Sequence, residues 1–279
     1  MDGLHNQVFA PLTLQELFDF WQRFPDAIPF AGGTELVRGQ GWRTFELPGN
    51  ILALFRLEEL RRISRTERYL EIGSAVTLDE MLGLGKILPE ILKLAVMEIA
   101  TPQIRNLATI GGNLCCPERR MDSFAAMVVL DARFELRTAN ASRWIAAGRF
   151  APGLGAPVLE KRELLTRIRI PLETWQHVSH CRIGQARWPD SEGAVFSFIA
   201  RTEKGILSEI RLALAGKELV RDREIENSII GKNLPLHRRE VDVFNDRWRT
   251  KLQDATFPEG LLRDRFLNLI EQAAFNLAD

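Results

Sequence analysis

Two glycine pairs, far apart in the chain, constrain this sequence more than any other feature. The first stands in Ala31-Gly32-Gly33-Thr34-Glu35 and the second in Thr109-Ile110-Gly111-Gly112-Asn113. Glycine permits positive φ and lacks the Cβ that would hold a ligand away from the backbone, while Thr and Asn add side-chain donors. Loops of this kind turn backbone N–H groups toward an anion. Two of them predict that one bound diphosphate contacts both loops.

The composition excludes several classes of function. The chain has 279 residues, of which 46% are hydrophobic and 27% charged, as in an ordinary globular protein. Basic and acidic residues number 37 each, so the net charge of zero argues against binding to nucleic acid or to an anionic membrane. No apolar run approaches the roughly 20 residues of a membrane span. The N-terminus lacks a signal-peptide pattern and the three cysteines make no disulfide framework, so we expect a cytoplasmic protein.

The first half of the chain alternates between strand and helix patterns. Two segments, Thr13-Leu14-Gln15-Glu16 and Thr77-Leu78-Asp79-Glu80, have the form of a capping box and predict helix starts. The other expected elements are strands at residues 27–30, 51–54, 69–75 and 133–136, and helices at residues 89–100 and 122–130.

The pattern changes after about residue 172. Residues 178–187, 194–201 and 206–215 predict three antiparallel strands, and amphipathic helices follow them. Strands and helices without regular βαβ alternation indicate an α+β fold. We expect one domain over residues 1–172, subdivided near residue 57, and a smaller C-terminal domain over residues 173–279. No G-x-G-x-x-G opens a helix after a strand, so a Rossmann domain is poorly supported.

A family resemblance rests on the second glycine pair and its surroundings. Residues 99–114, which read IATPQIRNLATIGGNL, together with residues 122–132, resemble the signature of the FAD-binding subunit of molybdenum hydroxylases. This is the xanthine dehydrogenase family, which includes the medium subunit of carbon monoxide dehydrogenase. The first loop, residues 31–36, matches the first flavin loop of that family at the expected distance.

The resemblance implies a fold, a cofactor and partners. The fold would be the two-part FAD-binding domain of the PCMH type, shared with vanillyl-alcohol oxidase relatives, followed by a smaller α/β C-terminal domain with a three-stranded antiparallel sheet and helices. The chain would be an oxidoreductase subunit. It would pass electrons from a small subunit with two-iron iron–sulfur clusters through FAD to NAD or another acceptor, while a molybdopterin-containing large subunit oxidises the substrate.

The resemblance also implies which residues contact FAD. The two loops would supply Ala31, Gly32, Gly33, Thr34, Glu35, Thr109, Ile110, Gly111, Gly112 and Asn113. Asp122 matches the acidic FAD contact of the family, and Leu165 and Arg182 fall where the family has an apolar wall and a basic residue beside the flavin. No residue is assigned as catalytic or as a metal ligand.

The segment between the second loop and Asp122 departs from the family pattern. It reads Cys115-Cys116-Pro117-Glu118-Arg119-Arg120-Met121, where small neutral residues are usual. The sequence leaves three roles open for Arg119 and Arg120. They would strengthen anion binding, bind an incoming nicotinamide dinucleotide, or form a solvent-exposed turn. Because of this departure, the alternative function is a degenerate subunit of the same fold that docks partners without binding FAD.

Two further groups resemble metal sites, and we interpret both as structural. Adjacent Cys115 and Cys116 cannot comfortably bind one ion, so we expect them to be packing residues. His177 and His180 would point to opposite faces of a strand, so they could not both coordinate one metal ion. Arg105 and Asn106 either order the second loop or contact the cofactor.

Overall fold

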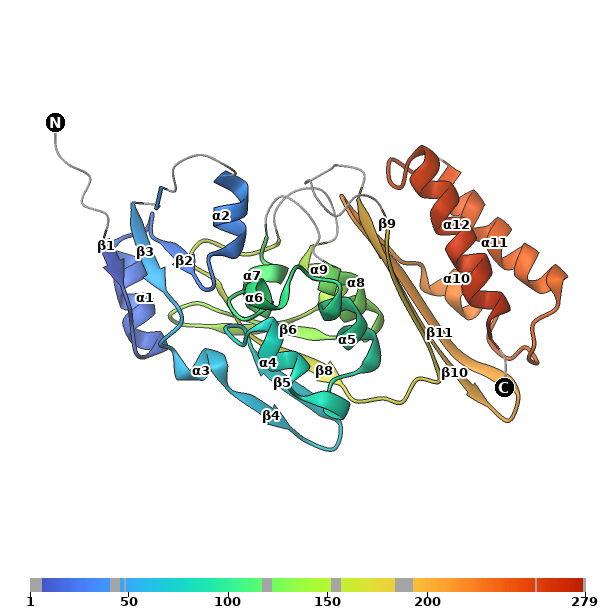
Figure 1. Ribbon diagram of the computed structural model, residues 1–279, viewed down its shortest axis with the longest axis horizontal. Coiled ribbons are helices and arrows are strands. Elements are labelled where there is room, and N and C mark those ends of the chain that lie inside the picture. The colour runs from blue at the N-terminus through green and yellow to red at the C-terminus, as the bar shows by residue number, and fades with distance from the viewer. Residues whose placement is uncertain are drawn as a thin grey trace.

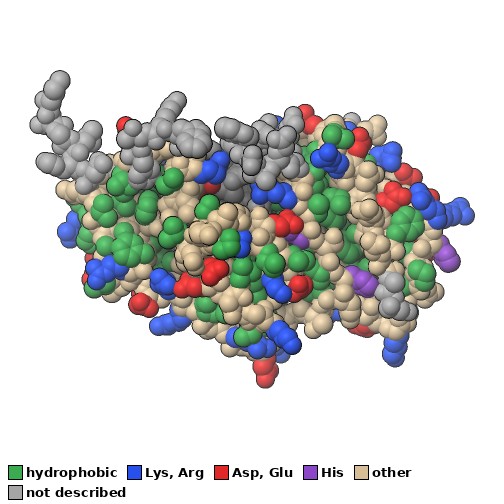
Figure 2. Space-filling model, in the orientation of Figure 1, with side chains coloured by type: hydrophobic (Ala, Val, Ile, Leu, Met, Phe, Trp, Pro, Cys, Tyr) green, Lys and Arg blue, Asp and Glu red, His purple; other side chains and the backbone are tan. Residues whose placement is uncertain are grey.

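The computed structural model describes residues 7–40, 46–47, 49–116, 122–151, 157–183, 193–253 and 255–277. Three sheets follow one another along the long axis of the molecule, from the N-terminal strands at one end to the last two helices at the other (Figure 1). Basic and acidic side chains are interspersed over the face shown in Figure 2, in line with the balanced net charge. None of the described helices is long and apolar enough to cross a membrane.

The first sheet is parallel, with strand order β1-β3-β2. Its elements are β1 (Gln7–Phe9), β2 (Ile28–Phe30) and β3 (Asn50–Ala53), with helices α1 (Leu14–Arg23) and α2 (Thr34–Gln40). Helix α1 packs its apolar face, which includes Leu17 and Trp21, against Leu52 of β3. Its start is capped as expected, because Thr13 Oγ1 accepts from the Glu16 N–H at 3.2 Å.

The second sheet is antiparallel, with strand order β4-β5-β8-β6-β7. The strands are β4 (Ile63–Arg65), β5 (Tyr69–Gly73), β6 (Arg133–Arg137), β7 (Ser142–Ala146) and β8 (Leu164–Pro171). The helical elements of this part are α3 (Glu58–Arg61), α4 (Leu78–Leu82), the 3-10 turn η1 (Gly85–Ile87), α5 (Glu90–Met97), α6 (Pro102–Arg105), α7 (Ile110–Leu114), α8 (Asp122–Val129) and α9 (Ala147–Phe150). One face of the sheet, with Ile72, Phe134 and Ile168, forms the largest core together with α5 and α8.

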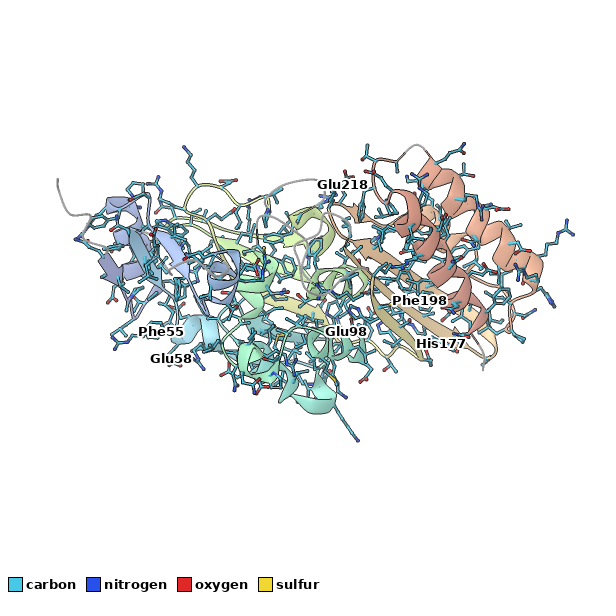
Figure 3. All side chains as sticks on the ribbon, turned by 45° about the horizontal axis from the view of Figure 1, so that its top comes forward. Phe55, Glu58, Glu98, His177, Phe198 and Glu218 are labelled. Atoms are coloured by element: carbon cyan, nitrogen blue, oxygen red, sulfur yellow. The ribbon has the colours of Figure 1, made fainter. Side chains whose placement is uncertain are left out.

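The third sheet lies between two layers of helices. It has strand order β12-β11-β10-β9, and its strands are β9 (His177–Ile183), β10 (Ala194–Glu203), β11 (Ile206–Ala215) and β12 (Leu219–Val220). Val195 and Ile199 of β10 join the core formed with α5 and α8. The alternate residues, such as Phe198, which is labelled in Figure 3, form a second core with the terminal helices. Figure 1 shows these helices covering that face of the sheet. These helices are α10 (Arg223–Asn227), α11 (Arg238–Gln253) and α12 (Gly260–Phe275).

The predicted fold class is confirmed, with local differences. The capping box at Thr77 and Glu80 is present in full. The three expected C-terminal strands form, and β12 adds a fourth that is too short for a sequence pattern. Helix α5 ends at Met97 rather than at residue 100, because Ala100 adopts a positive φ of 47°. The domain boundaries at residues 57 and 172 stay a prediction.

Candidate functional site

The fold brings the first glycine pair against the segment that precedes the second. A Cβ on Gly32 would lie 1.8 Å from the carbonyl oxygen of Leu107 and 3.1 Å from the backbone nitrogen of Ala108. No side chain fits in that space, so only glycine permits this approach. The next residue, Gly33, has a φ of +68°, a conformation that glycine adopts without strain.

The first loop presents three consecutive backbone donors. Within the described part of the chain, the N–H groups of Gly32, Gly33 and Thr34 have no hydrogen-bond acceptor. The Gly33 carbonyl accepts from the Val37 N–H at 3.1 Å, so α2 continues directly from the loop. Consecutive backbone N–H groups that have no acceptor among the described residues are the donors with which such loops bind an anionic oxygen.

The second loop uses its backbone donors differently from the expectation. The Ile110 and Gly111 N–H groups donate to the carbonyls of Val76 and Ser74, at 3.0 and 2.8 Å. A Cβ on Gly111 would lie 2.6 Å from the same Ser74 oxygen. These groups therefore hold the loop against the segment between β5 and α4, and they are not directed at a ligand.

The rest of the second loop forms the start of α7. The Thr109 Oγ1 caps this helix by accepting from the Gly112 N–H at 3.1 Å, and the Thr109 carbonyl accepts from the Asn113 N–H at 2.9 Å. Gly112 is exposed and not at positive φ. The nearest atom to a Cβ placed on it is that same Oγ1, at 3.1 Å. Gly112 therefore allows a ligand to approach the backbone closely.

Asn113 connects the second loop to α8. Its Oδ1 accepts a hydrogen bond from Ser123 Oγ. The amide Nδ2 therefore points away from Ser123, and no described residue accepts a hydrogen bond from it. Within the described part of the chain, the Nδ2 group is thus available as a ligand donor. The backbone of α8 starts at Asp122, and the Asp122 side chain lies outside the described residues, as do Arg119 and Arg120.

Glu35 lies at the contact between the two loops. Its carboxylate accepts from Arg38 Nε at 3.0 and 2.9 Å, and Cys116 Sγ lies 3.8 Å from its Oε1. The neighbouring Cys115 packs against the main core, and burial raises the pKa of its thiol to about 12. The packing interpretation of the two cysteines agrees with this geometry.

The remaining two predicted contacts come from other elements. Leu165 lies on β8 opposite Leu136, with only 2% of its surface exposed, in the core beneath α8. Arg182 lies on β9 opposite Val195 and is partly exposed. The structure places neither in the two glycine loops, and their contact with a flavin stays a prediction.

His177 and His180 both lie on β9, three residues apart, and so point to opposite faces of the sheet. The His180 ring is fully buried, with Nδ1 2.9 Å from Ser197 Oγ and Nε2 3.6 Å from a carboxylate oxygen of Glu98. Burial outweighs this partly exposed carboxylate and lowers the pKa of His180 to about 4. Among the described residues, no three His, Cys, Asp or Glu side chains form a group that could hold a metal ion.

Arg105 has a structural role that the sequence left open. Its guanidinium donates to the carbonyl oxygens of Met97, Ile99 and Ala100, at 3.3, 2.8 and 2.9 Å. It thereby fixes the turn between α5 and α6 that leads into the second loop. Sequence reasoning missed Ser74 and Ser123, which hold Gly111 and Asn113. A serine hydroxyl or carbonyl gives no pattern by which such a partner could be found.

The comparisons with known proteins agree with this geometry. Residues 4–173 match the protein family described as the FAD binding domain in molybdopterin dehydrogenase. The chain belongs to this family. The resemblance seen in the sequence is thus confirmed, and FAD is the cofactor by which the family is defined.

Individual relatives extend the match beyond this domain. The xanthine dehydrogenase FAD-binding subunit of Escherichia coli O157:H7 is 28% identical over 242 residues, which cover 84% of this chain and 82% of the relative. The nicotinate dehydrogenase FAD-subunit of Eubacterium barkeri is 33% identical over 171 residues, or 59% of this chain and 57% of the relative. These relatives are named as subunits of dehydrogenases, and so of oxidoreductases.

Solved structures show the same fold over nearly the whole chain. Carbon monoxide dehydrogenase from Hydrogenophaga pseudoflava matches with a TM-score of 0.79 and 23% identity, covering 96% of this chain and 94% of the matched one. Quinoline 2-oxidoreductase from Pseudomonas putida 86 matches with a TM-score of 0.78 and 21% identity, with the same coverage of both chains. At this identity the likeness establishes the fold alone.

Proposed function

We propose that this chain is the FAD-binding electron-transfer subunit of a molybdenum hydroxylase complex. The observation that supports it most is the first glycine loop, where three adjacent N–H groups without described acceptors lie against the segment leading to the second loop. The subunit takes electrons from the two-iron iron–sulfur clusters of a small subunit and passes them through FAD to NAD or another acceptor. A molybdopterin-containing large subunit oxidises the substrate, and the complex works in the cytoplasm.

The residues of the two loops fit a dinucleotide diphosphate in complementary ways. The N–H groups of Gly32, Gly33 and Thr34 neutralise phosphate charge without a long flexible side chain. Gly112 lets the ligand approach the backbone, and the Asn113 amide adds a side-chain donor. FAD supplies the redox chemistry when bound, while the protein supplies position and electrostatics.

Three residues outside the loops complete the proposed site. Asp122, at the start of α8, accepts a hydrogen bond from a ribose hydroxyl or a flavin N–H. Leu165 provides an apolar wall, and Arg182 provides a positive charge beside the flavin. Because Leu165 is buried in the chain alone, its contact with the flavin requires a small rearrangement of the core around it.

The absorption spectrum of the purified chain, recorded before and after addition of FAD, tests this function. We expect flavin bands in the visible region and release of FAD, not FMN, on denaturation. A colourless protein that does not respond to added FAD would instead support the degenerate subunit that only docks partners. In that case the three N–H groups of the first loop, which have no acceptor among the described residues, would need another explanation.

A further inference from the structure

The outer face of the second sheet, on the side away from α5 and α8, is rich in arginine. The five strands of this sheet contain six arginines, no lysine and two carboxylates, Glu71 and Glu135. The strand register places Arg169 between Glu71 and Arg133 on this face, and the next outward row places Arg167 opposite Glu135. Arginine is enriched and lysine depleted at protein interfaces, so this composition is typical of a contact surface.

The two carboxylates of this face lie beneath the arginines. Arg169 Nε donates to Glu71 at 2.6 Å, and Arg167 Nε donates to Glu135 at 2.9 Å. The side chains of Arg169 and Arg167 are 36% and 43% exposed, whereas those of Glu71 and Glu135 are only 19% and 6% exposed. The charge that this face presents to solvent is therefore positive, although each arginine has a carboxylate partner.

Arg133 adds a further positive charge to this face. It is exposed at the start of β6, next to Arg169 in the register, and within the described part of the chain it has neither an ion pair nor a side-chain hydrogen bond. At the other end of β6, Arg137 lies 3.9 Å from the half-exposed carboxylate of Glu59. The excess of positive charge is therefore greatest at the end of the face that carries Arg133.

Two aromatic rings order the guanidinium groups of this face. The guanidinium carbon of Arg169 lies 4.3 Å from the centre of the Trp144 ring and 5.6 Å from that of Tyr69. That of Arg167 lies 5.9 Å from the Trp144 ring. A guanidinium already held by a ring and a carboxylate loses little conformational entropy when a partner binds it. Trp, Tyr and Arg are also the residues that dominate the binding energy of protein interfaces.

We propose that this face, defined by Tyr69, Arg133, Trp144, Arg167 and Arg169, docks an acidic segment of a partner subunit. Carboxylate side chains of the partner match the forks of the guanidinium groups, and opposite charge steers and orients the two surfaces. The proposal rests on the function proposed above, in which this chain is one subunit of a complex.

The charges of the face and of the chain favour a protein partner over a nucleic acid. A nucleic acid presents a continuous line of phosphates, and affinity for it comes from many neutralising cations. Here the Glu71 and Glu135 carboxylates lie directly beneath the arginines, and the whole chain has a net charge of zero. A short acidic protein segment that reaches the arginines between these carboxylates fits this arrangement better.

The docking face can be probed selectively, because Tyr69 is the only tyrosine of the chain and is exposed. Tetranitromethane nitrates exposed tyrosines, so mass spectrometry of this chain after treatment reports on Tyr69 alone. We expect nitration to be at least about fivefold slower in the complex with the molybdopterin and iron–sulfur subunits than in the isolated chain, because the partner covers the ring. Nitration at the same rate in both would overturn the proposal.

Charge variants test the chemistry of the partner, with the dissociation constant of the complex as the readout. Arg133→Glu is expected to weaken assembly about tenfold, because an acidic partner then meets a like charge. The substitution leaves the ion pairs of Arg167 and Arg169 in place. Arg133→Lys keeps the charge and is expected to stay within about threefold of the wild type. The matched control is Arg249→Glu, at an exposed arginine on α11 beyond the third sheet (Figure 1), which should assemble like the wild type.

The remaining outcomes separate this inference from the proposed function. A chain that does not assemble with those subunits overturns the proposed function, and this inference with it. A complex that forms equally well with Arg133→Glu overturns the inference alone, as does an equal loss of affinity in Arg249→Glu. Slow nitration of Tyr69 in the isolated chain, together with a dimer in sedimentation, would assign the face to a second copy of this chain and overturn the acidic partner.

Discussion

Gly32 and Gly112 belong to similar motifs, yet their surroundings predict different effects of the same substitution on folding stability. In Gly32→Ala the new Cβ would lie 1.8 Å from a backbone oxygen, so the two loops must separate. We expect a loss of roughly 1–3 kcal/mol in folding stability together with loss of FAD. In Gly112→Ala the new Cβ lies 3.1 Å from Thr109 Oγ1 alone, so the fold survives while the methyl group obstructs the ligand.

Thermal melting of the FAD-free proteins and FAD titration check this contrast. Gly112→Ala should have a melting temperature close to that of the wild type and bind FAD weakly. Gly32→Ala should have both a lower melting temperature and weaker FAD binding. Equal FAD affinity in a folded Gly112→Ala variant would remove that position from the cofactor site. A wild-type melting temperature for Gly32→Ala would contradict the close contact between the loops.

A second prediction at this scale concerns pH and His180. Burial lowers its pKa from 6.5 to about 4, so the unfolded chain takes up a proton below pH 6.5 while the folded ring stays neutral. The folded state therefore loses stability as the pH falls from 6.5 toward 4, by about 3 kcal/mol from this group. Urea titrations at pH 7 and pH 4.5 should show a smaller loss in His180→Gln than in the wild type. Equal losses would contradict a buried neutral ring.

Single residues were predictable from the sequence only where they carry a pattern. The glycine pairs and the threonine caps recur in recognisable spacing, and the structure brings the two pairs into one region. The internal use of the Ile110 and Gly111 N–H groups could not be foreseen, because their acceptors come from residues 74 and 76 through tertiary contact. Arg105 was ambiguous for the same reason: its three acceptors depend on how the preceding turn folds.

At the scale of elements, the C-terminal end of α8 is held by arginines from the third sheet and the segment after it. Arg221 and Arg211 donate to the carbonyls of Val128 and Val129, at 2.7 and 3.1 Å. Both also pair with Asp131, at 2.7 and 3.1 Å, and each has only 11% of its side chain exposed. Positive charge at the C-terminal end of a helix is favourable. Because these arginines are poorly solvated, removing one partner of such a pair is costly, since it leaves a charge uncompensated.

Asp131→Asn tests this arrangement. Asp131 has a φ of 51°, which Asn tolerates well, so the substitution removes the charge without adding backbone strain. We expect a loss of roughly 2 kcal/mol in the free energy of unfolding by urea, since two poorly solvated arginines lose their shared counter-ion. Arg223→Ala, which removes the 69% exposed third partner, should cost less than about 1 kcal/mol. Equal effects of the two variants would show that the pairs with Arg211 and Arg221 contribute little.

Elements were easier to predict than their ends. Hydrophobic periodicity located the helices and long strands, because each of them buries one regular face. The end of α5 depends on the Arg105 side chain and on Ala100 at positive φ, and neither is a local sequence signal. The two-residue strand β12 forms only because β11 offers it an edge.

The change in sequence pattern near residue 172 suggests a separate C-terminal domain. The third sheet, however, also forms part of the core of the preceding residues. One face of this sheet completes the core around α8, whose residues 123–129 are all buried. Val195, Ile199, Ala213 and Ala215 supply that cover from β10 and β11. The opposite face is packed against α11 and α12. The sheet is therefore shared between two cores, and a division of the chain at residue 172 cuts through one of them.

A fragment of residues 1–172 should consequently fail to form a native core by itself, although it contains both glycine loops. We expect it to bind the dye ANS and to lack the near-ultraviolet circular dichroism of the full chain, because α8 loses one of its two apolar partners. Co-expression with residues 173–279 should restore both signals and FAD binding. A well-packed fragment that binds FAD alone would show that the first two sheets suffice, and that the third sheet serves mainly to meet partner subunits.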